Sequence, residues 1–332
     1  MKRHDPIARR RYDSLYKSGE LRERAEKLNK RLAECDICPR SCRVNRLEGS
    51  GGFCRSGRLV SVASRCAHHG EEPTLSGTRG SGTIFFNSCN LKCIYCQNSQ
   101  ISQGYSSLSK QVDSRGLAGM MLYLQDDLHC HNINLVSPTH YVPQIVEAVC
   151  EAVPLGLDIP IVYNTNGFDS VETLSMLDGI VDIYLPDIKY ASDKWAYKFS
   201  GARQYVKHSR LCILEMYRQV GNLKTDDKGV AQSGLIVRHL ILPNRLSGSA
   251  DSLKWLATSV SRNVTLSIMA QYYPCHLAPD EPLLARRITA GEYREVVDTM
   301  TGLGMENGWL QQLDSAEHYL PDFHREGHPF SG

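Results

Sequence analysis

Three cysteines that follow a short apolar run are the residues of this sequence best suited to chemistry. Cys89, Cys93 and Cys96 lie within eight residues of one another. Soft thiolate ligands select zinc or an iron–sulfur cluster. A structural zinc site needs a fourth ligand nearby, and the next candidates, Gln97 and Asn98, are poor zinc ligands. Three thiolates on a four-iron cluster leave one iron without a protein ligand, so the spacing predicts a catalytic [4Fe-4S] cluster that is open to a chelating cofactor.

A second group of cysteines lies nearer the amino terminus. Cys35, Cys38 and Cys42 are followed by Cys54 twelve positions later. Four soft ligands satisfy either a tetrahedral zinc ion or a fully ligated auxiliary iron–sulfur cluster, and the spacing leaves both open. Thiols without a metal are the remaining interpretation. A closed four-thiolate site has no vacant position, so we expect this group to be separate from the place where a cofactor reacts.

The pattern of apolar residues from about position 84 onward predicts a parallel sheet with crossover helices. Short β-branched or aliphatic runs alternate with longer stretches in which apolar residues recur every three or four positions. The strands are expected at 83–87, 132–137, 159–164, 180–187, 235–242 and 263–270. The helices are expected at 142–153, 171–177, 206–220, 252–260 and 291–303. We therefore predict an α/β fold, a partial (β/α)6 TIM-like barrel with a small N-terminal cysteine-rich metal-binding extension.

Polar residues stand at or just after the end of each expected strand. They occupy positions 88–98, 137–140, 164–167, 187–189, 243–244 and 271–276. In α/β barrels the carboxyl ends of the strands meet at one rim, where catalytic residues collect. These loops should therefore converge on a single site.

The chain divides into three expected parts. Residues 1–78 hold a charged helix near 19–34 and the cysteine-rich metal-binding segment, which is loop-rich. Residues 79–304 form the barrel. Residues 305–332 form a polar C-terminal tail that we expect to be solvated.

Composition and charge exclude several classes of function. The formal net charge of +2 and the isoelectric point of about 7.9 lack the strong positive charge that is typical of nucleic-acid-binding proteins. No apolar run approaches the roughly 20 residues of a membrane span, and the amino terminus lacks the apolar core of a secretion signal. We therefore expect a cytoplasmic protein with no membrane and no nucleic-acid partner. In a reducing compartment, clustered cysteines among the twelve are better explained as metal ligands than as disulfides.

The cysteine triplet resembles the signature of the radical S-adenosylmethionine (SAM) superfamily. That signature is Cys-x3-Cys-x2-Cys with an aromatic residue before the last cysteine, a place that Tyr95 fills. The resemblance implies that the open iron is chelated by the amino and carboxylate groups of S-adenosylmethionine. One electron from the reduced cluster then cleaves the cofactor to methionine and a 5′-deoxyadenosyl radical, which abstracts hydrogen from a substrate. The implied cofactors are a [4Fe-4S] cluster and S-adenosylmethionine.

Further motifs resemble an uncharacterised branch related to pyruvate formate-lyase activating enzyme. These are Tyr-Asn-Thr-Asn-Gly at 163–167 and Tyr-Leu-Pro-Asp-Ile-Lys at 184–189, and the N-terminal cysteine region is also similar to that branch. The sequence departs from the activase at Gln97, where histidine is typical, and at Val-Ser-Pro-Thr in positions 136–139, which replaces Gly-Gly-Glu. The contact to the cofactor amino group is then expected from Asn134, Ser137, Thr139 or His140.

The same resemblance implies how the barrel rim binds the cofactor. Lys189 and Arg238 are suited by charge to the carboxylate of S-adenosylmethionine, and Asp187 lines the cofactor beside them. Asn164 and Asn166 are expected to form a polar wall.

Two functional hypotheses follow. The first is a radical SAM enzyme, an oxidoreductase that takes electrons from a donor such as flavodoxin or ferredoxin and acts on an unidentified substrate. A protein substrate, as in glycyl-radical activation, is the narrower version. The alternative is an iron–sulfur or zinc-binding protein, or an electron carrier, that does not cleave S-adenosylmethionine. A carrier usually ligates every iron with protein, so the three-ligand triplet favours the enzyme.

Overall fold

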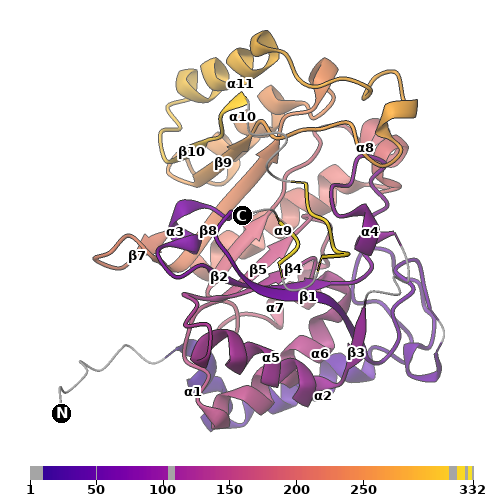
Figure 1. Ribbon diagram of the computed structural model, residues 1–332, viewed down its shortest axis with the longest axis vertical. Helices are drawn as coiled ribbons and strands as arrows, with labels where there is room; N and C mark the ends of the chain where they lie inside the picture. Colours follow the sequence, from indigo (N-terminus) through magenta and orange to yellow (C-terminus); the bar gives the residue numbers. More distant parts are fainter. Residues whose placement is uncertain (1–9, 50, 104–108, 314–319, 326–327, 331–332) are drawn as a thin grey trace.

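A single curved sheet organises the chain. The computed structural model describes residues 10–49, 51–103, 109–313, 320–325 and 328–330. In that part of the chain the strand order is β10-β9-β8-β6-β5-β4-β2-β1-β3, with β7 (Lys224–Thr225) paired to β8. Figure 1 shows α1, α2, α5 and α6 on one side of this sheet and α10 and α11 near its far end.

The parallel part of the sheet contains all six strands expected from the sequence. Each pairs in parallel with its neighbour in chain order. They are β2 (Ser81–Phe86), β4 (Ile133–Val136), β5 (Ile161–Thr165), β6 (Ile183–Pro186), β8 (Ala231–Leu240) and β9 (Thr265–Met269). Because the order never reverses and crossovers are right-handed, the helices cover one face and the sheet curls around the other. The predicted α/β class and partial barrel are confirmed.

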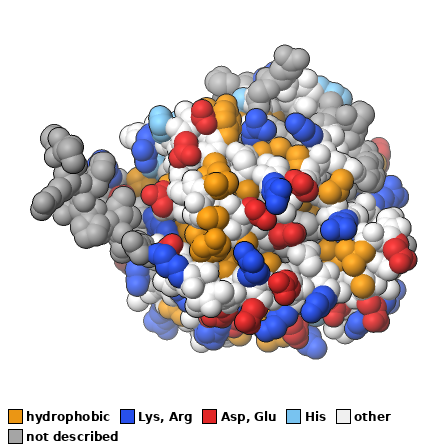
Figure 2. Space-filling view, turned by 90° about the horizontal axis from the view of Figure 1, so that it is seen from below, with side chains coloured by type: hydrophobic (Ala, Val, Ile, Leu, Met, Phe, Trp, Pro, Cys, Tyr) orange, Lys and Arg blue, Asp and Glu red, His pale blue; other side chains and the backbone are white. Residues whose placement is uncertain are grey.

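Helices occupy the connections between these strands. The helices at the amino terminus and before β4 are α1 (Arg11–Ser18), α2 (Glu20–Lys30), α3 (Pro73–Ser76), α4 (Ser99–Ser102) and α5 (Ser114–Asp126). The helices after β4 are α6 (Val142–Ala152), α7 (Val171–Ser175), α8 (Asp193–Ser200), α9 (Tyr205–Val220), α10 (Ser249–Ser259) and α11 (Ala290–Gly302). No helix in the described ranges is long and apolar enough to cross a membrane. Figure 2 shows basic and acidic side chains interspersed on the face seen from below.

The sheet extends past both expected boundaries of the barrel. β1 (Val60–His68) lies inside the segment expected to be loop-rich, yet it pairs antiparallel with β2, and β3 (Lys110–Val112) pairs with β1. At the other end, β10 (Gly308–Leu310) adds a parallel strand beside β9. Only two of the nine residues of β1 are β-branched, so its sequence carries a weak strand signal.

The N-terminal helices belong to the main core. Tyr12 of α1 and Leu21 and Leu28 of α2 have no exposed surface, and all three join the cluster that fills the space between the sheet and its helices. Gly19 adopts a left-handed conformation with φ of 83°, which lets the chain turn between α1 and α2. The cysteine-rich loops that follow are therefore anchored on a helix packed against the barrel.

The described part of the C-terminal segment packs on the inner face, which differs from the solvated tail that we expected. Phe323 meets Phe85 of β2 edge to face, with ring centroids 5.3 Å apart. Phe330 stacks on His68 of β1 at 4.4 Å. Figure 1 shows this yellow segment crossing over the sheet. Aromatic burial outweighs the polar character of the surrounding sequence.

Candidate functional site

The inner face of the barrel changes from apolar to polar along β5, β6 and β8. Val162, Leu185 and Ile236 form an apolar cluster at the floor of the barrel. Two residues further along the same strands or just beyond them come Asn164, Asp187 and Arg238. Because side chains alternate between the two faces with a period of two, these polar residues point to the same side as the apolar floor, one step nearer the rim.

A cavity of about 440 Å³ opens above this floor. Its walls come from the loop after β2, the carboxyl ends of the parallel strands, residues 70–73, β10 and Phe330. Of the barrel residues that we expected at the site, Asn134 does not line this cavity. Those that do are Cys89, Cys93, Tyr95, Cys96, Asn164, Asn166, Asp187, Lys189 and Arg238.

Each sulfur of the cysteine triplet lies within hydrogen-bond distance of a polar side chain from a different loop or helix. Asn166 Nδ2 lies 3.3 Å from Cys89 Sγ, and Ser200 Oγ lies 3.0 Å from Cys93 Sγ. The third contact joins Ser102 Oγ and Cys96 Sγ at 3.1 Å. Side-chain donors around sulfur are the arrangement that stabilises thiolate ligands and tunes an iron–sulfur cluster. Neither serine was found from the sequence.

The triplet loop is held in place by the end of α8. The amide of Lys92 donates to the carbonyl of Ser200 at 3.1 Å, and the amide of Ile94 donates to the carbonyl of Phe199 at 2.9 Å. Ser88, just before the first cysteine, has a positive φ of 70° that turns the chain out of β2. These contacts fix a loop that has no regular secondary structure of its own.

A chain of hydroxyl groups leads from Tyr95 to the triplet. Tyr95 and Tyr190 share a hydrogen bond of 2.6 Å between their hydroxyls, and Tyr190 and Ser200 share one of 2.7 Å. Each hydroxyl has one proton to donate. If Ser200 donates to Cys93, then Tyr190 must donate to Ser200 and Tyr95 to Tyr190. Tyr95 is therefore connected to the sulfur of Cys93 as well as to the cavity.

The donor set of the triplet fits an iron–sulfur cluster. Burial raises the pKa of the Cys93 thiol to about 12 and that of Cys96 to about 11, so ligation to a metal is what would make them thiolates at neutral pH. Among the described residues, no group of three or more His, Cys, Asp or Glu side chains is placed to hold a single metal ion. The three cysteines nevertheless line one cavity, and each sulfur lies near a side chain that can donate a hydrogen bond to a thiolate.

In the same cavity, Asp187 lies between two cations. Lys189 Nζ donates to Asp187 Oδ2 at 2.5 Å, and Arg238 Nε donates to Asp187 Oδ1 at 3.0 Å. Burial alone would raise the pKa of Asp187, but Lys189 and Arg238 outweigh it and hold that pKa below its ordinary value. Arg238 also donates through Nη2 to Asn164 Oδ1 at 2.7 Å. The structure therefore brings together four of the residues that we expected to bind the cofactor.

Two buried glutamates in the same cavity were missed from the sequence. Glu71 Oε2 lies 3.6 Å from Arg238 Nη1, and Glu71 Oε1 accepts from Asn134 Nδ2 at 3.0 Å. Asn134 thus supports Glu71 from behind the cavity wall. Glu72 Oε2 is buried and has no hydrogen-bond partner in the described structure. Burial raises the pKa of both carboxyl groups. Their only sequence signal was a pair of acidic residues before a proline.

Of the other residues considered for the cofactor amino group, Ser137 alone lines the cavity. Thr139 contacts Thr165 through a hydroxyl pair at 3.2 Å. His140 Nε2 lies 3.0 Å from the carbonyl oxygen of Asn87 and faces the N-terminal cysteines instead. Ser137 has a positive φ of 57°, at the turn that follows β4.

Three glutamines form an amide network at another wall of the cavity. Gln97 Nε2 donates to the carbonyl of Gln271 at 3.0 Å, and the side chains of these two residues bond at 3.1 Å. Gln311 Nε2 donates to Gln271 Oε1 at 2.7 Å. The network ties the triplet loop to the ends of β9 and β10. Gln97, which departs from the histidine of the activase pattern, therefore has a clear structural partner.

The four N-terminal cysteines line a separate small cavity. Arg40, Arg46, Asn90 and His140 also contribute to its wall. Asn90 directly follows Cys89, so the two cysteine groups meet at one residue of the triplet loop. The structure thus brings the four expected ligands together, beside the barrel rim.

No protein-family model matches the chain. An uncharacterised protein of Methanocaldococcus jannaschii is 29% identical over 276 residues, which cover 80% of this chain and 73% of that protein.

Three solved structures are similar to the chain at low identity. TYW1 with a lysine-pyruvate adduct bound is 10% identical, with 70% of this chain and 78% of that chain covered and a TM-score of 0.44. HydG, a maturase of the [FeFe]-hydrogenase, is 10% identical, with 68% and 51% covered and a TM-score of 0.45. OxsB, a cobalamin-dependent S-adenosylmethionine radical enzyme with aqua-cobalamin bound, is 11% identical, with 76% and 39% covered and a TM-score of 0.38. All three scores lie below 0.5, so none of these likenesses decides the fold or the function of this chain.

Proposed function

We propose that this protein is a radical SAM enzyme whose [4Fe-4S] cluster is held by Cys89, Cys93 and Cys96. When bound, the cluster supplies one electron that cleaves S-adenosylmethionine, and the resulting 5′-deoxyadenosyl radical takes hydrogen from a substrate. The observation that carries the proposal is one cavity of about 440 Å³, lined by these three cysteines and by the charged residues Asp187, Lys189 and Arg238. That volume lies within the roughly 300–1,000 Å³ typical of cofactor and ligand sites.

The residues around the cavity match the charges of S-adenosylmethionine. Lys189 lies close enough to Cys93 for each to shift the pKa of the other, which puts a cation beside the triplet. Lys189 and Arg238 orient the cofactor carboxylate at this point, and Asp187 keeps both cations in position. Asn164 and Asn166 offer amide groups on the same wall. Phe330 and Tyr95 cover apolar surface and exclude water.

We further propose a protein substrate and a low-potential electron donor for this enzyme. The motifs at 163–167 and 184–189 support a protein substrate, as in glycyl-radical activation by an enzyme similar to pyruvate formate-lyase activating enzyme. Cleavage requires a low-potential one-electron donor such as flavodoxin or ferredoxin. A protein substrate and a soluble electron donor both fit a cytoplasmic enzyme that needs neither a membrane nor a nucleic acid.

The test is S-adenosylmethionine cleavage by the anaerobically reconstituted, full-length chain. With dithionite, the wild type should form 5′-deoxyadenosine, measured by liquid chromatography. The triple variant Cys89→Ala/Cys93→Ala/Cys96→Ala should form none. Cys150→Ala, which alters a half-buried cysteine outside both groups, should behave as wild type.

Two outcomes would reject the proposed function. One is 5′-deoxyadenosine formation by the triple variant. The other is a wild-type protein that takes up iron yet neither binds nor cleaves S-adenosylmethionine, which would favour the electron carrier that the seven clustered cysteines also suit.

A further inference from the structure

The four N-terminal cysteines are brought together within one stretch of chain, residues 35–54. The amide of Cys35 donates to the carbonyl of Val44 at 3.0 Å, and the amide of Arg43 donates back to the carbonyl of Cys35 at 2.9 Å. This pair closes the loop that carries Cys38 and Cys42. Gly52 lies so close that an added Cβ would stand 2.9 Å from Cys42 Sγ, so only glycine lets the segment with Cys54 approach.

Two arginines line this pocket, and neither has an acidic partner in the described chain. Arg46 is only 1% exposed. It donates to the carbonyls of Ser56, Gly57 and His140 at 2.8–3.1 Å and lies 3.8 Å from Cys35 Sγ. Arg40 is half-buried: its guanidinium lies 3.6 Å from the centroid of the Phe53 ring, and its buried Nη2 has no hydrogen-bond partner in the described structure.

Buried cations need a counter-charge. A buried, unpaired charge is strongly unfavourable, and four neutral thiols would provide no negative charge for Arg40 and Arg46. Four thiolates bound to a metal centre provide it, because ligation makes the sulfurs anionic even where they are shielded from water. The charge balance of the pocket therefore favours ligated sulfur, above all beside the buried Arg46.

The spacing of the four sulfurs distinguishes the two metals that four thiolates suit. A zinc ion lies about 2.3 Å from each of its sulfur ligands, so a zinc site draws all four sulfurs around one ion. Among the described residues, which include these four cysteines, no group of three or more His, Cys, Asp or Glu side chains is placed to hold a single metal ion. The arrangement therefore favours a cluster of several irons, in which each cysteine binds a different iron.

Arg40 also connects this pocket to the catalytic triplet. Its Nε donates to the carbonyl of Asn90 at 2.9 Å, and its Nη1 donates to the carbonyl of Gly201 at 2.5 Å. The Asn90 side chain accepts from Asn166 Nδ2 at 2.7 Å, and the same Nδ2 lies 3.3 Å from Cys89 Sγ. Arg40 lines the N-terminal pocket and reaches Cys89 through Asn90 and Asn166, so one cation is shared by the two sets of ligands.

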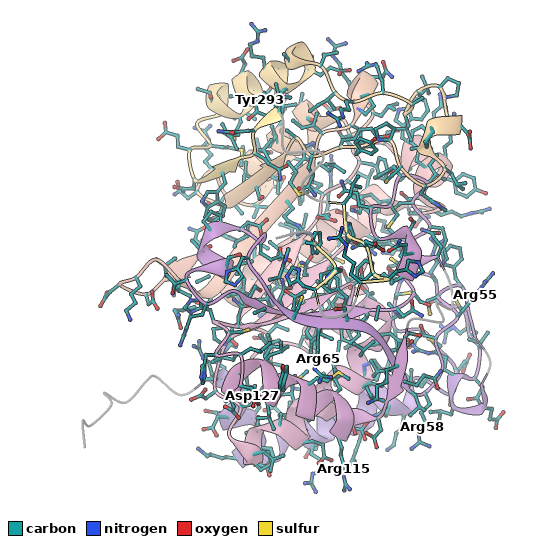
Figure 3. The ribbon with its side chains drawn as sticks, in the orientation of Figure 1. Arg55, Arg58, Arg65, Arg115, Asp127 and Tyr293 are labelled. Carbon is teal, nitrogen blue, oxygen red and sulfur yellow. The ribbon has the colours of Figure 1, made fainter. Side chains whose placement is uncertain are left out.

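We propose that Cys35, Cys38, Cys42 and Cys54 hold a second, fully ligated four-iron cluster that is redox-coupled to the catalytic cluster through Arg40. One electron from an external low-potential donor reduces the N-terminal cluster and then passes to the triplet cluster, with no bond made or broken. The cysteine loop lies near the surface, since Arg55, next to Cys54, stands at the outer edge of the molecule in Figure 3. The relay role rests on the proposed function, whereas the cluster itself does not.

The first experiment counts metals in the anaerobically reconstituted protein. The wild type should hold about eight irons per chain, and the Cys89→Ala/Cys93→Ala/Cys96→Ala variant should keep about four, with the Mössbauer signature of a four-iron cluster. This variant leaves the N-terminal ligands intact, so the result does not depend on folding without them. About one zinc per chain, or no metal beyond the triplet cluster, would overturn the proposal.

The second experiment tests the coupling by redox titration followed by electron paramagnetic resonance. Arg40→Met should lower the midpoint potentials of both clusters, because reduction adds negative charge that the shared cation stabilises. Arg43→Met is the matched control. Arg43 directly follows Cys42, but its side chain pairs with Glu34 and Asp36 at the surface, so its loss should change neither potential. A shift at one cluster alone, or at neither, would refute the coupling. Neither readout needs S-adenosylmethionine, so an intact pair of clusters without cofactor cleavage would reject only the proposed function.

Discussion

At the scale of single residues, the sulfurs of the triplet are distinguished by what contacts them. Asn166, Ser200 and Ser102 come from three separate parts of the chain, and each reaches a different cysteine. A hydrogen bond to a thiolate withdraws electron density from the cluster and stabilises its reduced form. These residues should therefore set the potential at which the cluster accepts an electron.

Ser200→Ala should make the potential of the triplet cluster more negative. A net hydrogen bond of about 1 kcal/mol corresponds to a shift of roughly 40 mV in a one-electron couple. Ser252→Ala removes a buried hydroxyl that has no hydrogen-bond partner in the described structure and lies on α10, so it should leave the potential unchanged. The measurement is an anaerobic redox titration of both variants. An unchanged potential in Ser200→Ala would show that this hydroxyl does not tune the cluster.

Arg238 and Lys189 should contribute to cofactor affinity. A charge-assisted hydrogen bond contributes about 1.5–3 kcal/mol, so Arg238→Ala and Lys189→Ala should each weaken S-adenosylmethionine binding roughly ten- to a hundredfold. Iron content serves as the folding control for both. Arg210→Ala, at a half-buried arginine on α9 that lies over the ring of Trp255, should bind as wild type. Wild-type affinity in both pocket variants would place the carboxylate elsewhere.

At the scale of elements, His239 joins three pieces of structure that position the site. One ring nitrogen, Nδ1, lies 2.7 Å from the carbonyl oxygen of Ile188, in the loop that carries Asp187 and Lys189. The other, Nε2, lies 2.8 Å from Ser249 Oγ at the start of α10. β8 is thereby tied to the loop after β6 and to the next helix. The side chain is fully buried, and burial lowers its pKa from 6.5 to about 4.

This shift predicts that His239 favours folding at neutral pH and loses that effect in acid. The unfolded chain binds a proton near pH 6.5, whereas the folded chain does so only near 4, so protonation favours unfolding as the pH falls between these values. His239→Gln cannot be charged. The stability difference between wild type and variant should therefore shrink by about 2 kcal/mol from pH 7 to pH 5, measured by urea unfolding. A difference that stays constant would mean that His239 titrates normally.

At the scale of the whole molecule, the cysteine-rich segment is not an independent appendage. α2 packs against α6, its leucines belong to the main core, and β1 forms part of the sheet beside β2. The cavity wall also depends on this region, because Glu71 and Glu72 lie between β1 and α3. The expected boundary at residue 78 therefore cuts through the sheet and through the wall of the site.

The N-terminal segment and the barrel should consequently unfold together. In native-state hydrogen exchange, the buried amides of α2 and α6 should report the same opening free energy. Leu28→Ala, which removes a fully buried side chain of α2, should destabilise the whole chain by about 2–5 kcal/mol and lower protection in both helices. Loss of protection in α2 alone would indicate a separately folding N-terminal unit.

The six parallel strands and five of the helices around them could be predicted from the sequence, namely α6, α7, α9, α10 and α11. The patterns that predict them are local, because an apolar run, or apolar residues recurring every three or four positions, can be recognised within one short segment. The cysteine triplet could also be recognised in the sequence, since its three cysteines lie within eight positions. Asn164, Asp187 and Arg238 could be expected at one rim because parallel strands end on the same side of a barrel.

The residues that complete the site could not be predicted from the sequence. Glu71, Ser200 and Gln311 reach the cavity or the sulfurs from positions distant in sequence, and no local pattern marks them. The weak strand β1 forms because β2 and β3 offer it backbone partners on both edges. The contact between the two cysteine groups depends on Arg40 reaching Asn90, fifty residues away. Such contacts depend on how the folded chain packs, and spacing along the sequence does not encode them.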